Sequence, residues 1–191
     1  MGQVAVIGGG AFGTAMACVL RRRGHDVVLW AREPEVVEAI DQARENRLFL
    51  RGVNLPEGIA ATTEMAAAVR GADFVVLVPP AQHMRAVTSQ LQPLLAPGTP
   101  VVSCSKGIER GTCALMSGVL GDTLPQAPLA ILSGPSFAAD IAVDRPAGVT
   151  LACADPVLGA RLEDAIGSGR FRVYLSDDVV GAQIGGVIKN V

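Results

Sequence analysis

The chain has 191 residues, a length that accommodates one substantial domain and part of a second. Apolar residues make up 50% and charged residues 18%, which excludes disordered, collagen-like and disulfide-scaffold proteins and allows a large core. The formal net charge of -2 leaves no basic surplus for nucleic-acid phosphates, so we expect no nucleic-acid partner.

The N-terminal segment shows the alternation of a strand, a helix and a second strand. A β-branched run at 3–7 ends at glycines, residues 11–23 have helical spacing and are closed by Gly24, and a second apolar run covers 26–30. Two strands joined by a helix within about 30 residues form a right-handed βαβ unit with parallel strands.

The same alternation continues along the chain. Helical spacing predicts further helices at 35–43, 65–69 and 85–95, and the stretch 46–60 is predicted to be a loop leading to a minor strand. Apolar runs predict strands at 73–78, 100–104, 129–132, 149–152 and 171–175. Several of these runs are continuous rather than alternating, as in strands buried on both faces. We therefore predict an α/β fold, a doubly wound and mostly parallel sheet with helices on both faces.

A glycine turn follows the first predicted strand. Gly8, Gly10 and Gly13 form the pattern G-x-G-x-x-G between a strand and a helix. In a dinucleotide-binding turn the first glycine permits the bend, the second lets the backbone approach a pyrophosphate, and the third lets helix and strand pack closely. The helix N-terminus adds free N–H groups and a partial positive charge. The pattern predicts a Rossmann-like dinucleotide site, with a merely glycine-rich turn as the alternative.

The end of the second strand bears on the choice between NAD and NADP. An acidic residue at this point accepts a hydrogen bond from the ribose 2′-OH of NAD. Here Ala31 takes that place, followed by Arg32, which can pair with the 2′-phosphate of NADP, and by Glu33, which could still bind the ribose. We expect NADP to be preferred, with NAD as the alternative. The other interpretation of Arg32 is an ordinary solvated charge.

Three further segments combine glycine, serine and lysine in unusual ways. They are S-C-S-K-G-I-E at 103–109, S-G-P-S-F-A at 133–138 and G-G-V-I-K-N-V at 185–191. The first two each follow a predicted strand. Because ligands bind beyond the carboxyl ends of the strands in a doubly wound sheet, we expect Lys106, Gly134 and Ser136 to face the same crevice as the glycine turn.

These motifs carry a resemblance that covers essentially the whole chain. The chain resembles the N-terminal part of the bacterial-type NAD(P)-dependent glycerol-3-phosphate dehydrogenases. That family shares the G-x-G-x-x-G start, an L-W second strand, the K-G-I-E and G-P-S-F-A segments and a K-N-V helix, and all five occur here in the same order. One departure is the pair Pro79-Pro80, where the family often has Pro-Ser.

The resemblance implies roles for individual residues. In that family the lysine matching Lys189 is the proton donor or acceptor, and the lysine matching Lys106 contacts both substrate and cofactor. We accordingly expect Lys189 and Lys106 to be catalytic. The expected substrate-binding residues are Lys106, Gly134, Ser136, Lys189 and Asn190. The expected cofactor-binding residues are Gly8, Gly10, Ala11, Phe12, Gly13, Arg32, Lys106 and Ala138. For Phe12, a place in the core is the alternative.

The resemblance also implies an activity. It implies an oxidoreductase that interconverts sn-glycerol 3-phosphate and dihydroxyacetone phosphate with NADP(H) or NAD(H), supplying glycerol phosphate for phospholipid synthesis. A cationic donor beside the reacting oxygen would stabilise the alkoxide and supply its proton. The expected partner is a small phosphorylated substrate, and a homodimer is considered for the full-length protein. The alternatives are a related hydroxy-acid dehydrogenase and a non-catalytic NAD(P)-binding module.

The C-terminal segment suggests a domain boundary. We expect residues 1–176 to form the dinucleotide-binding domain and residues 177–191 to begin a helical substrate domain that the chain lacks, because a helical pattern from Val179 runs to the last residue. On this interpretation the chain is a fragment that is inactive alone. The alternative is a short terminal helix docked on the sheet.

Cysteine usage and hydropathy bear on the cellular location. The 4 cysteines, Cys18, Cys104, Cys113 and Cys153, form no C-x-x-C pair, and with only 2 histidines they give no metal site. We expect buried, reduced thiols in a cytoplasmic protein. The uncharged start of the chain is not predicted to enter a membrane, because its basic residues follow rather than precede it and glycines interrupt it.

Overall fold

The computed structural model describes residues 2–188, which form one eight-stranded sheet in the order β3-β2-β1-β4-β5-β6-β7-β8. The strands are β1 (Gln3–Ile7), β2 (Asp26–Trp30), β3 (Ile59–Thr62), β4 (Phe74–Leu77), β5 (Val101–Ser103), β6 (Leu129–Ser133), β7 (Ala147–Cys153) and β8 (Phe171–Ser176). Neighbouring strands are parallel except for β6 and β7, which are antiparallel. The prediction of a mostly parallel α/β sheet is confirmed.

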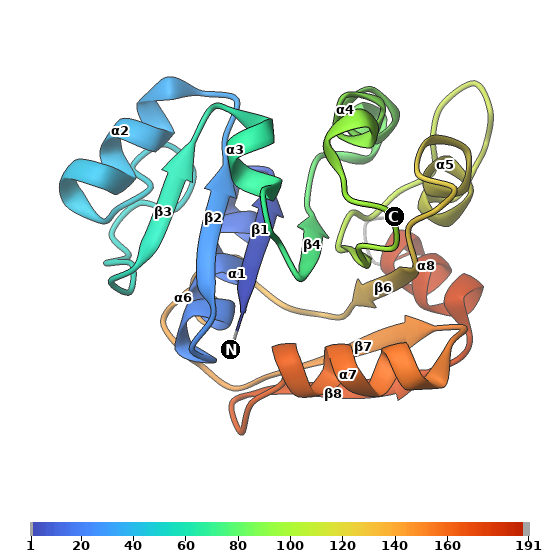
Figure 1. The fold of residues 1–191 in the computed structure, drawn as a ribbon. Helices are drawn as coiled ribbons and strands as arrows, with labels where there is room; N and C mark the ends of the chain where they lie inside the picture. The colour runs from blue at the N-terminus through green and yellow to red at the C-terminus, as the bar shows by residue number, and fades with distance from the viewer. Residues whose placement is uncertain (1, 189–191) are drawn as a thin grey trace.

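Helices cover both faces of this sheet (Figure 1). They are α1 (Ala11–Arg22), α2 (Pro34–Ala43), α3 (Met65–Val69), α4 (Met84–Leu91), α5 (Met116–Thr123), α6 (Ala138–Ala142), α7 (Pro156–Ile166) and α8 (Val179–Ile188). One apolar core lies between the sheet and α1, α2, α6 and α7, and a second lies between the sheet and α3, α4 and α5. Helix α8 packs against β6 and β7.

The centre of the sheet contains the point where the strand order reverses. Strand β1 pairs with β2 on one side and with β4 on the other, so the chain first runs outward to β3 and then returns to build the other half. All four residues of β4 are buried, as expected from its continuous apolar run. In such sheets the crevice beyond the carboxyl ends of the strands at the reversal is the place where ligands bind.

Three helices were not predicted, and one predicted helix ends early. Helices α5, α6 and α7 lie in segments for which no helix was predicted, because α5 contains two glycines and α6 has only 5 residues. The helix predicted to reach Leu95 ends at Leu91 and continues as a 3₁₀ turn, Gln92–Leu94. Pro93 lies in that turn and has no N–H to continue an α-helix.

The cysteine prediction needs one correction. Cys18, Cys104 and Cys153 are buried free thiols, but Cys113 is exposed. It lies in the loop after the K-G-I-E segment, with a left-handed backbone, φ 58°. Among residues 2–188, no helix has the length and apolar character needed to cross a membrane.

Candidate functional site

A cavity of about 560 Å³ opens at the carboxyl ends of β1, β2, β4 and β5. Its wall is formed by Gly8, Gly9, Gly10, Ala11, Phe12, Gly13, Trp30, Arg32, Glu33, Phe49, Val78, Pro79, Pro80, Ala81, His83, Val87, Cys104, Ser105 and Lys106. The cavity therefore lies at the reversal of strand order, where the topology places ligand sites.

The glycine turn forms the floor of the cavity, and its geometry requires glycine at two positions. Gly8 has φ +127°, which side-chain-bearing residues rarely adopt, and its N–H donates to the Trp30 carbonyl at 3.0 Å. A Cβ on Gly13 would overlap the Gly8 carbonyl oxygen, so helix α1 can approach the turn only with glycine there. A Cβ on Gly10 would meet nothing within 4 Å. The space in front of Gly10 and the N-terminus of α1 is thus open.

Arg32 and Glu33 stand together at the rim of the cavity. The Arg32 Nε and Nη2 groups donate to Glu33 Oε1 at 3.1 and 2.9 Å, and the Arg32 side chain is 77% exposed. Because an exposed pair contributes little to stability, Arg32 can exchange its partner at low cost. The guanidinium is therefore available to an anion that enters the cavity at this end.

Lys106 lines the same cavity, in the loop that follows β5. Its ammonium donates to the Gly134 carbonyl at 2.9 Å and lies 5.9 Å from the centre of the Phe12 ring. The next residue, Gly107, has φ +146°, and a Cβ there would come within 2.6 Å of the Ala81 side chain. The K-G pair thus lets the loop turn against Ala81 and present its lysine to the cavity.

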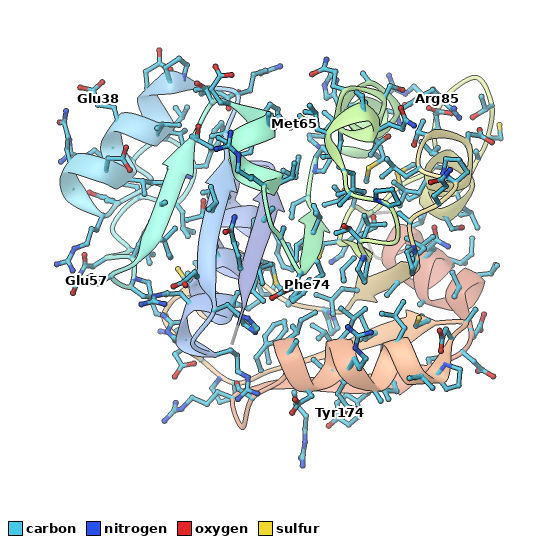
Figure 2. All side chains as sticks on the ribbon, in the orientation of Figure 1. Glu38, Glu57, Met65, Phe74, Arg85 and Tyr174 are labelled. Atoms are coloured by element: carbon cyan, nitrogen blue, oxygen red, sulfur yellow. The ribbon has the colours of Figure 1, made fainter. Side chains whose placement is uncertain are left out.

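Hydrogen bonds from the 3₁₀ turn Ala81–His83 and from α4 hold the loop that carries Lys106. The Gln82 side chain donates to the Ile108 carbonyl at 2.8 Å and accepts from the Arg110 N–H at 3.0 Å. Arg85, on α4 (Figure 2), makes two 2.9 Å hydrogen bonds to the Glu109 carboxylate. The Arg85 guanidinium holds the pKa of Glu109 below its usual range, with a smaller effect from Thr112. The K-G-I-E segment is therefore held at the carbonyl of its isoleucine and at the carboxylate of its glutamate.

The structure brings together most of the residues expected at the site. Gly8, Gly10, Ala11, Phe12, Gly13, Arg32 and Lys106 line the cavity, and Gly134 contacts Lys106. Phe12 also packs against the core, which was the alternative place predicted for it. Three of the expected residues, Gly134, Ser136 and Ala138, do not line the cavity. The Ser136 hydroxyl is buried with no hydrogen-bond partner among the described residues, and Ala138 begins α6 and packs on the core. Lys189 and Asn190 lie outside the described residues.

Sequence reasoning missed several cavity-lining side chains. Trp30, Phe49 and His83 all face the cavity, and the large apolar ring of Phe49 is 41% exposed there. Phe49 lies in the segment predicted only as a loop, and an isolated aromatic residue in such a segment gave no signal of its place. Cys104 also lines the cavity, but burial raises the pKa of its thiol to about 12, so it stays protonated and is not a nucleophile.

Within 2–188, no group of three or more His, Cys, Asp or Glu side chains is arranged to hold a metal ion.

Comparisons with known proteins agree with this geometry. Residues 3–158 match the family model described as the N-terminus of NAD-dependent glycerol-3-phosphate dehydrogenase. The chain belongs to this family. The prediction made from the five motifs is confirmed.

Individual relatives extend over the whole chain. A glycerol-3-phosphate dehydrogenase [NAD(P)+] of Paramagnetospirillum magneticum is 55% identical over 100% of this chain and 69% of its own length, and one of Rhodospirillum rubrum is 54% identical over 99% and 54%. The crystal structure of the Coxiella burnetii glycerol-3-phosphate dehydrogenase superposes with a TM-score of 0.93 at 32% identity, over 98% of this chain and 57% of that one. The chain thus spans between half and about two thirds of the length of these glycerol-3-phosphate dehydrogenases.

Proposed function

We propose that the chain binds NADP(H) or NAD(H) in the cavity at the glycine turn and that, within the whole protein, it interconverts sn-glycerol 3-phosphate and dihydroxyacetone phosphate. The observation that carries the proposal is that Lys106 and the G-x-G-x-x-G turn line one cavity, with the Lys106 ammonium 5.9 Å from the centre of the Phe12 ring. Membership of the glycerol-3-phosphate dehydrogenase family and relatives named for use of NAD(P)+ support it.

The described residues fit a dinucleotide. The pyrophosphate would lie before Gly10, where a Cβ would have open space, and would accept from the free N–H groups at the start of α1. Arg32 would leave Glu33 to pair with a 2′-phosphate, which favours NADP, while Glu33 would be the acceptor for the ribose hydroxyls of NAD. Phe49 and Trp30 would cover the apolar faces of the ligand.

The substrate would lie beside Lys106. When bound, the nicotinamide supplies the hydride that adds to C2 of dihydroxyacetone phosphate. Lys106 would stabilise the developing negative charge on the substrate oxygen, and the Gly134 carbonyl and the Phe12 ring would hold its ammonium in place. The buried Ser136 hydroxyl, which lacks a partner among the described residues, would bind the substrate together with Gly134 and Asn190. Lys189 would give or take the proton.

We further propose the biological setting that goes with this activity. The enzyme would supply glycerol phosphate for phospholipid synthesis, act in the cytoplasm, and assemble as a homodimer at full length. Residues 1–176 would form the dinucleotide-binding domain, and 177–191 would begin the helical substrate domain, which would provide the other ligands of the phosphate.

The test separates binding from turnover. Titration of the 191-residue chain with NADPH, followed by the fluorescence of the nicotinamide, should give saturable binding, and NADH should bind more weakly. In the full-length protein, addition of dihydroxyacetone phosphate should cause oxidation of NADPH, and Lys106→Ala should weaken both substrate and cofactor binding. Arg110→Ala, a change in an exposed side chain of the same loop, is the matched control. NADPH binding without any turnover in the full-length protein would leave a binding module.

A further inference from the structure

The structure contains a buried polar contact between the glycine turn and the loop at 46–55. Asn46 is 0% exposed. Its side-chain Nδ2 donates to the Gly9 carbonyl and to Thr14 Oγ1, both at 2.8 Å, and its Oδ1 accepts from the Phe49 N–H at 3.1 Å. Both donor hydrogens and the acceptor of the amide are thereby used. No role in the proposed chemistry accounts for this arrangement.

The hydrogen bond from Asn46 to the Gly9 carbonyl constrains the Gly9–Gly10 peptide of the glycine turn. The Gly9 carbonyl and the Gly10 N–H belong to one planar trans peptide, in which the two groups point in opposite directions. Asn46 holds the carbonyl from the side of the loop at 46–55. Gly10 lies on the other side and lines the cavity.

We propose that Asn46 is a positioning residue for the cofactor, because it fixes the Gly9–Gly10 peptide so that the Gly10 N–H faces the pyrophosphate site. The same side chain holds the backbone of Phe49, whose ring lines the cavity, and so keeps the turn and this part of the wall in one arrangement. The inference rests on the proposed function, since it takes the ligand to be a dinucleotide.

Without Asn46, the Gly9–Gly10 peptide could adopt other orientations. Glycine on both sides of the peptide bond leaves its rotation nearly unrestricted by sterics. Gly9 is buried, so its carbonyl would lose its protein partner and would gain one by turning toward the solvent of the cavity. Such a rotation replaces a donor with an acceptor at the point where an anion binds.

The decisive variant is Asn46→Asp. Aspartate keeps the shape of the side chain and the acceptor for Phe49 but faces the Gly9 carbonyl with an oxygen in place of an NH₂ group. We expect the NADPH affinity of the 191-residue chain to fall about 10- to 100-fold, as for the loss of one charge-assisted hydrogen bond. Asn54→Asp makes the same change at an exposed position of the same loop and should alter affinity less than twofold. Asn46→Ser, which is neutral and too short to reach Gly9, is the second variant if aspartate prevents folding.

A second measurement distinguishes positioning from a general loss of stability. Val53 is buried in the same loop, and Val53→Ala should lower the melting temperature without changing NADPH affinity. The ¹H–¹⁵N signal of the Gly10 amide should respond to inorganic pyrophosphate in the wild type and in Val53→Ala, and it should not respond in Asn46→Asp.

The possible results separate the two proposals. NADPH binding by folded Asn46→Asp within twofold of the wild type would overturn the role of Asn46 and leave the proposed function intact. A loss of affinity in Val53→Ala that matches its loss of stability would also overturn it, because the effect of Asn46 would then be merely structural. Failure of the wild-type chain to bind any dinucleotide would refute the proposed function, and the inference with it.

Discussion

Two glycines of the same turn should respond to substitution in opposite ways. Gly10 has φ -70° and ψ -179°, an extended backbone that any residue adopts, and a Cβ there meets nothing within 4 Å. Gly13 lies in α1, and a Cβ there would overlap the Gly8 carbonyl oxygen. We therefore predict that Gly10→Val impairs binding and spares the fold, whereas Gly13→Ala impairs the fold.

Two opposing contributions decide whether Gly13→Ala raises or lowers the stability of the fold. Replacement of glycine by alanine inside a helix gains about 1 kcal/mol of helix propensity. The overlap is with a backbone atom of a turn that is itself fixed by the Gly8 to Trp30 hydrogen bond, so overpacking of about 1–3 kcal/mol or more opposes that gain. The cost of the clash should exceed the gain in helix propensity, so Gly13→Ala should be less stable than the wild type.

For Gly10→Val we expect little change in stability but a loss of NADPH affinity. The stability of Gly10→Val should stay within about 0.5 kcal/mol of the wild type, because the added atoms point into open space. The same atoms would occupy the space for the pyrophosphate and displace at least one charge-assisted hydrogen bond. At about 1.5–3 kcal/mol for that bond, NADPH affinity should fall about tenfold or more.

Urea unfolding followed by circular dichroism measures the first quantity, and calorimetric titration with NADPH measures the second. Gly13→Ala with wild-type stability would mean that the close approach of α1 to the turn is not needed. Gly10→Val with unchanged affinity would mean that the dinucleotide lies elsewhere.

Three further outcomes are expected. Arg32→Asp should shift the ratio of NADPH to NADH affinity toward NADH, and an unchanged ratio would return Arg32 to an ordinary surface charge. Because Arg85 lowers the pKa of Glu109 in the folded state, its stabilisation is present above the unfolded value of about 4.3 and is lost as the pH falls. Glu109→Gln should therefore lower the urea midpoint at pH 7 by an amount that shrinks toward pH 3, and a gap independent of pH would contradict the ion pair. Maleimide at neutral pH should label Cys113 well before Cys104, whose pKa is raised to about 12 by burial, as peptide mass spectrometry would reveal.

The parts of the fold that could be predicted are those with a local signal. The buried strands β1 and β4 contain continuous apolar runs, and the turn after β1 contains glycines at positions where the backbone requires them. Helix α7 also carries a local signal, because the Asp155 carboxylate accepts from the N–H groups of Val157 and Leu158 and Pro156 takes the first helical position. The helix was not predicted, because hydrophobic spacing alone did not indicate it, although the Asp-Pro start signal is present in the sequence.

Other features depend on partners far away in the sequence. Asn46 lies 37 residues from Gly9 and 32 from Thr14, and nothing in its neighbourhood distinguishes it from a solvated loop amide. Phe49 lines the cavity from a loop whose Leu50, Val53 and Leu55 belong to the core cluster that also contains residues of α1 and α2. Such contacts exist only once the sheet has formed, so periodicity and spacing could not predict them.

The K-G-I-E segment joins both kinds of information. From the sequence alone, the motif indicates a functional lysine, and the other residues have no evident role. In the fold, Gly107 is needed for its left-handed backbone beside Ala81, and Glu109 is needed as the partner of Arg85 on α4. The three residues therefore act together, because a lysine can stabilise charge at a defined point only if its loop has one conformation. A motif of this kind identifies a site by its packing requirements as much as by its reactive group.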